Sequence, residues 1–136
     1  MPPRFFDAVA KVGQTVRLMA VLPDKLQSRI VSASLSQWSR IKASNFPPAL
    51  RTEFEVLDKR MTVGPTTEDV IRAGGGLIHA TVLKMNDDEA RDLAEAIGTF
   101  AYEVRQESER YRYDRDFRAQ LDEELLSIID ATETAS

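Results

Sequence analysis

Two side chains near the middle of the chain have the chemistry of an acid–base site. His79 is the only histidine among the 136 residues, and histidine is the side chain whose unperturbed pKa lies nearest neutral pH. Arg72 precedes it by seven residues, and a guanidinium beside an imidazole can hold a phosphate while the imidazole transfers protons. Gly74, Gly75 and Gly76 lie between them. Because a glycine triplet is very flexible, we interpret it as a flexible functional loop or hinge, with an anion-binding nest as the alternative.

The arginine and the histidine resemble the motif of HEPN ribonucleases, which are small helical bundles and often dimers. In that family an arginine is followed a few residues later by a histidine, usually on one continuous helix, whereas the glycine triplet interrupts the segment here. The resemblance implies an RNA-cleaving bundle in which Arg72 stabilises the phosphate and His79 performs the acid–base chemistry. This is the alternative hypothesis for function.

A second stretch, ESERYRYDRDFR at 107–118, alternates arginines with aromatic rings, as grooves that bind nucleic acids do. From Arg105 to Arg118 there are five arginines but also four acidic residues, whereas a phosphate-binding strip is dominated by one sign. Arg105 and Glu109 lie four residues apart, which is the spacing of ion pairs along a helix. The stretch therefore predicts a charged helical surface, and we do not expect a nucleic acid as partner.

The sequence lacks the motifs of several other catalytic chemistries. It has no cysteine, so thiolate metal ligands and disulfides are excluded. It also has no Glu-x-x-His pair of a di-iron bundle, no Gly-x-Ser-x-Gly elbow and no Gly-Lys-Ser/Thr phosphate loop. Asp87, Asp88, Glu89 and Asp92 cluster where a helix should begin, and carboxylates stabilise that end of a helix. We expect no metal and no cofactor.

Apolar residues recur at three- and four-residue steps along most of the chain, which predicts helices nearly everywhere. A first helix should end at Pro23, and a second should begin with Asp24 as N-cap and carry its apolar face to Ile41. Pro47 and Pro48 should open a third. Residues 77–85 could form a strand, but no second strand candidate could pair with them, so a short helix is expected.

The strongest helix signal begins at Asn86, where Glu89 completes a capping box. Its predicted buried face consists of Leu93, Ile97, Phe100, Val104 and Tyr111. A second apolar stripe follows out of phase, at Phe117, Leu121, Leu125 and Ile128. The helix therefore either bends near 112–116 or runs on and contacts different neighbours at its two ends.

These elements predict an all-α fold, a single-domain bundle of five or six helices. One domain fits the length, and 43% hydrophobic residues can build a modest core. We place the domain at residues 1–130, with a flexible loop at 62–76 that contains a short helix over 66–73, and a disordered tail at 131–136.

Charge and the N-terminal segment bear on partners and location. Residues 1–63 carry a balance of +5 and residues 64–136 a balance of −9. The two halves can neutralise each other within one fold, or the first half can offer a basic surface to a polyanion. Asp7, Lys11 and Arg17 interrupt the apolar N-terminal residues, which argues against a signal peptide or membrane span. We expect a cytoplasmic protein.

One further resemblance covers residues 46–97. FPPALRTEFEVLDKRMT followed by ATVLKMNDDEARDLAEAI is similar to a pattern in small bacterial helical proteins of uncharacterised function. The resemblance implies a bacterial origin and a helical bundle. Because no enzymatic motif in the chain is better supported, the sequence favours a non-enzymatic protein–protein interaction module. This module would act through a helical face and form a homodimer.

Overall fold

The computed structural model describes residues 4–62, 76–113 and 122–129, and every regular element in these ranges is helical. The prediction of an all-α, single-domain bundle is confirmed. Residues 122–129 form a helix, and the other elements are α1 (Phe5–Val21), α2 (Leu26–Ser36), η1 (Trp38–Arg40), η2 (Ala43–Asn45), α3 (Pro48–Thr62), α5 (Gly76–Leu83) and α6 (Asp87–Tyr113), where η denotes a short 3₁₀ helix.

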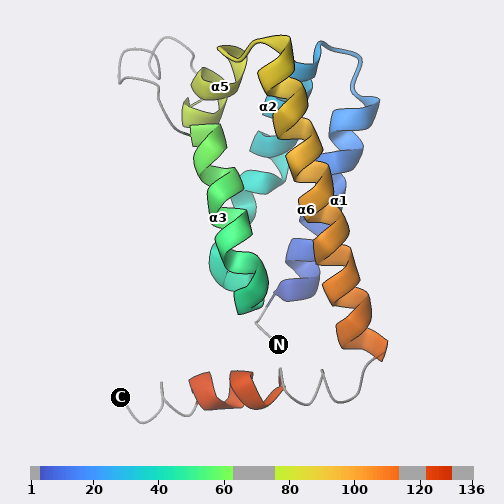
Figure 1. The fold of residues 1–136 in the computed structure, drawn as a ribbon, viewed down its shortest axis with the longest axis vertical. Helices are drawn as coiled ribbons and strands as arrows, with labels where there is room; N and C mark the ends of the chain where they lie inside the picture. Colours follow the sequence, from blue (N-terminus) through green and yellow to red (C-terminus); the bar gives the residue numbers. More distant parts are fainter. Residues whose placement is uncertain (1–3, 63–75, 114–121, 130–136) are drawn as a thin grey trace.

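The long helix α6 runs the length of the bundle, and Figure 1 shows α3 on one side of it and α1 on the other. Helix α1 packs against α2 and α6, while α5 packs against α2 and α3 at one end of the bundle. The helix at 122–129 lies at the opposite end. In the described ranges, no helix combines the length and apolar character that crossing a bilayer requires.

Aromatic rings form the centre of the core. Trp38 stacks on Phe54 at 4.9 Å between ring centroids, and its indole Nε1 donates a 3.1 Å hydrogen bond to Asp58. Phe46 and Phe100 pack edge to face at 5.4 Å, the geometry that aromatic quadrupoles favour. These rings come from η1, α3, α6 and the turn before α3, so one cluster joins elements far apart in sequence.

Prolines delimit the first three helices, but the second differs from expectation. Leu22 before Pro23 and Phe46 before Pro47 are both extended, as residues before proline tend to be. The N-cap of α2 is Lys25 and not Asp24, without a side-chain capping bond. The helix ends at Ser36 and not near Ile41. The 3₁₀ turn η1 follows, in which Trp38 is fully buried.

The join between α5 and α6 matches the sequence signals closely. The backbone N–H of Glu89 donates to Asn86 Oδ1 at 2.8 Å, and the N–H of Asn86 donates to Glu89 Oε1 at 3.1 Å, so the predicted capping box is confirmed. The buried Gln27 of α2 secures the same join, because its amide donates to Met85 O at 3.1 Å and to Asp87 Oδ1 at 3.0 Å.

Replacing Gln27 should loosen this join. Gln27→Met keeps the side-chain volume but removes both donors, so the partly buried Met85 carbonyl loses a partner. We expect a loss of about 1–3 kcal/mol in the free energy of unfolding, measured by urea denaturation. Gln14→Met at an exposed position of α1 is the matched control. Equal losses in the two variants would contradict the role assigned to Gln27.

The predicted buried face of α6 is confirmed, whereas the later stripe is not buried as expected. All five residues of the first face are buried. In the helix at 122–129, Leu125 is half-buried and Ile128 is 57% exposed, so this part of the second stripe does not pack into the bundle core. Tyr111 Oη donates a 3.0 Å hydrogen bond to Asp122 and so joins the start of this helix to the end of α6.

Several expectations fall outside the described residues. They include the short helix at 66–73, residues 114–116 of the predicted bend near 112–116, the tail at 131–136, and Phe117 and Leu121. The predicted loop at 62–76 meets described residues only at its ends, where Thr62 closes α3 and Gly76 opens α5.

Candidate functional site

The predicted acid–base site lies largely outside the described residues. Arg72, Gly74 and Gly75 lie outside the described residues, Gly76 is the first residue of α5, and the backbone of His79 belongs to the same helix. The prediction of a short helix at this place is confirmed. RNA cleavage by Arg72 and His79 stays a prediction. Incubating RNA with the wild type and with the Arg72→Ala and His79→Ala variants would test it.

The acidic residues at the start of α6 have structural partners. Glu89 closes the capping box, Asp87 accepts from Gln27, and Asp88 pairs with Arg91 at 3.4 Å. In the described part of the chain, no three histidine, cysteine or carboxylate side chains converge as metal ligands. The predicted ion pair between two residues four apart along α6 is also confirmed, because Arg105 and Glu109 form a 3.3 Å ion pair.

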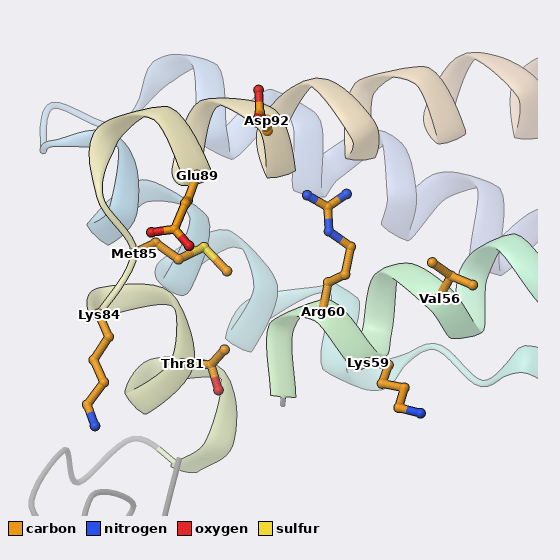
Figure 2. Close-up of a pocket in the computed structure, with 8 residues that line it drawn as sticks. All are labelled: Val56, Lys59, Arg60, Thr81, Lys84, Met85, Glu89 and Asp92. Carbon is orange, nitrogen blue, oxygen red and sulfur yellow. The ribbon is translucent and has the colours of Figure 1, made fainter. Parts of the chain in front are cut away.

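A cleft opens where α3, α5 and α6 meet, near the end of the bundle that carries α5 (Figure 2). Its volume is about 620 Å³. Helix α3 contributes three side chains, α5 with the turn after it another three, and the first turns of α6 two. The lining residues are Val56, Lys59, Arg60, Thr81, Lys84, Met85, Glu89 and Asp92.

Two apolar side chains, Val56 and Met85, line the cleft together with charged side chains of both signs. Figure 2 shows Met85 extending into the space between the helices, and Arg60 reaching from α3 toward α6. Val56 is 55% exposed on the α3 side. Among the described residues, Arg60 takes part in none of the ion pairs, although Asp92 stands on the facing helix. Arg60 is exposed and lines the cleft.

The lining offers both charged and apolar side chains to a ligand. Glu89 already accepts a backbone hydrogen bond, so its carboxylate is committed to the helix start. Lys59 and Arg60 can bind carboxylates while Val56 and Met85 receive apolar side chains. Because Glu89 and Asp92 also line the cleft, its charge is mixed, whereas a site for a dense polyanion such as a nucleic acid is dominated by cations. The cleft therefore fits an amphipathic segment with moderate negative charge.

A second group of titratable side chains lies between α3 and α6. A hydrogen bond with Glu103, together with partial burial and the negative charge of Glu103, raises the pKa of Glu53 to about 7 from the usual 4.5. Both residues are half-buried. Near neutral pH Glu53 is therefore only partly protonated, and the proton that joins its carboxyl to that of Glu103 is lost as the pH becomes mildly alkaline.

The shared proton predicts a pH-dependent stability. Glu53 keeps its proton in the folded state at pH values where the unfolded chain has lost it, because its pKa rises from 4.5 to about 7 on folding. Its stabilising contribution is complete below the lower value and is lost as the pH rises through the higher one. Glu53→Gln keeps a hydrogen-bond donor at every pH, so its stability relative to the wild type should increase from pH 5 to pH 8.

Urea denaturation at several pH values would measure this difference. Glu55→Gln, at an exposed position two residues further along α3, is the matched control and should leave the pH dependence of the wild type unchanged. If the two glutamine variants gave the same pH profile, the bridge between Glu53 and Glu103 would be contradicted.

Neither the cleft nor the glutamate pair could be recognised from the sequence. Glu53 lies beside the apolar stripe of α3, and Glu103 precedes the buried Val104 of α6. Glutamates at the border of an apolar face are ordinary in amphipathic helices. The signal that was missed is the packing of α3 against α6, which places these borders side by side.

Comparison of the chain with models of known protein families, with curated proteins and with solved structures finds no match in any of the three. The resemblances to HEPN ribonucleases and to small bacterial helical proteins therefore stay expectations.

Proposed function

We propose that the protein is a non-enzymatic, cytoplasmic protein-binding module of bacterial origin that holds an acidic amphipathic helix of a partner in the cleft between α3, α5 and α6. The single observation that carries the proposal is the composition of this cleft, in which the exposed cations Lys59 and Arg60 stand beside the apolar side chains of Val56 and Met85.

The geometry resembles the general mode in which an amphipathic helix lies in a groove. An apolar side chain of the partner would rest on Val56 and Met85, while carboxylates on its flank would meet Lys59 and Arg60. Opposite charges on the partner and on the margin of the cleft affect the orientation of the partner and the rate of association more than the affinity. Binding would therefore weaken as salt increases.

Fluorescence anisotropy with a labelled helical peptide would test this function. The peptide carries leucines four residues apart and glutamates on both flanks, and a matched peptide has lysine in place of each glutamate. We expect the acidic peptide to bind and the basic peptide to bind at least about tenfold more weakly. Lys59→Glu combined with Arg60→Glu should reverse this preference.

The double variant Arg17→Glu with Lys25→Glu is the control, because it makes the same charge change at exposed positions of α1 and the start of α2. It should bind the acidic peptide like the wild type. If the acidic peptide did not bind, or if both double variants weakened it equally, the cleft would not be the binding site.

A further inference from the structure

We propose that the segment that fills the cleft is the helix at residues 122–129 of a second copy of the chain, so that two copies form a reciprocal dimer. This inference rests on the proposed function and names its partner. It is carried by the chemistry of the segment, by its exposed apolar face and by the distance between the segment and the cleft of its own chain.

The segment has the composition that the cleft requires. Its sequence is DEELLSII, with acidic residues only at its start and four large aliphatic residues after them. At helical spacing Leu125, Leu126, Ile128 and Ile129 share one face, and Glu123 and Glu124 lie on its two flanks. The cleft presents a complementary arrangement, with the cations Lys59 and Arg60 beside the apolar side chains of Val56 and Met85.

The apolar face of the segment is largely exposed to solvent within a single chain. Leu126 is 61% exposed and Ile129 is 42% exposed. Contiguous exposed aliphatic side chains on a helix mark an interaction surface. Figure 1 shows the segment below the end of the bundle and not against one of its sides.

The segment cannot reach the cleft of its own chain from this position. Tyr111 holds Asp122, the first residue of the segment, through a 3.0 Å hydrogen bond. At 1.5 Å per residue, Tyr111 and Asp92 lie about 28 Å apart along α6, whereas residues 122–129 extend over only about 12 Å of helix. The cleft and the segment therefore lie at opposite ends of the molecule, as Figure 1 shows for α5 and the C-terminal helix.

A twofold axis perpendicular to α6 removes this separation. It places the end with the C-terminal helix of one copy beside the cleft end of the other, so each copy gives a helix and receives one. Such an interface is closed, because the two contacts are identical and no binding site is left for a third copy. The two copies would then bury the Leu126 side chain of each against Val56 and Met85 of the other.

Charge-swapped variants of the full-length chain test this arrangement. The first variant carries Lys59→Glu and Arg60→Glu in the cleft, and the second carries Glu123→Lys and Glu124→Lys in the segment. Alone, each variant would place like charges at both contacts, so we expect its dimer Kd to rise at least about tenfold. Mixed in equal amounts, they restore opposite charges at both contacts, and a heterodimer should form.

Sedimentation velocity and light scattering give the mass of each species. We expect the wild type to be a dimer, both variants to be monomers under the same conditions, and their mixture to be a dimer. Leu126→Ser with Ile129→Ser should also dissociate the dimer, whereas Val21→Ser with Leu35→Ser, at exposed apolar positions of α1 and α2, should not. Circular dichroism of each variant verifies that the helices are retained.

A wild type that stays monomeric, or a dimer that both charge variants leave intact, would overturn the inference. Failure to form a heterodimer from two folded variants would overturn it too. None of these results contradicts the proposed function as long as the acidic peptide still binds at Lys59 and Arg60. If neither the second copy nor the peptide binds there, the inference and the proposed function fail together.

Discussion

Phe100→Ala should lower the free energy of unfolding by about 3–5 kcal/mol, the range typical for truncation of a buried aromatic side chain. Phe100 is almost completely buried in the middle of α6. Its ring lies 5.9 Å from Trp38 and 5.4 Å from Phe46 between ring centroids, both in edge-to-face geometry. Removing it leaves a cavity between elements that α6 holds together, and the rigid rings around it can fill that cavity only in part.

Urea denaturation followed by circular dichroism measures this loss, and Tyr102→Ala on the same helix is the matched control. Tyr102 is 64% exposed, so its truncation should cost well under 1 kcal/mol. If Phe100→Ala were no more destabilising than Tyr102→Ala, the aromatic cluster would not be the centre of the core.

Much of the fold could be predicted because its signals are local. The capping box of Asn86 and Glu89 places the start of α6 correctly, since both residues and their backbone partners lie within one turn. Prolines likewise mark the end of α1 and the start of α3. The second helix was predicted too long, because the apolar spacing continues through Trp38 although the chain turns into η1 there.

The cleft could not be predicted because it depends on contacts between helices. Arg60 and Asp92 look like ordinary solvent-exposed charges in the sequence, and only the packing of α3, α5 and α6 places them in the lining of one cleft. The same holds for Gln27, which is 58 residues away from Met85 in sequence and donates to its carbonyl. Sequence spacing did single out Arg72 and His79 as a site, but Arg72 lies outside the described residues, so this prediction stays untested.

Leu57→Ala and Ile97→Ala should each lower the free energy of unfolding by about 2–4 kcal/mol, as truncations of buried aliphatic side chains do. Leu57 lies on the buried face of α3 and Ile97 on that of α6, and these two helices pack against each other. Val56→Ala, next to Leu57 but 55% exposed, is the control and should cost well under 1 kcal/mol. If the two side chains share one cavity, the double variant should lose less free energy of unfolding than the sum of the two single losses. If they do not, its loss should equal that sum. Urea denaturation in which both single variants lose less than the control would show that the apolar faces of α3 and α6 are not what holds the walls of the cleft in place.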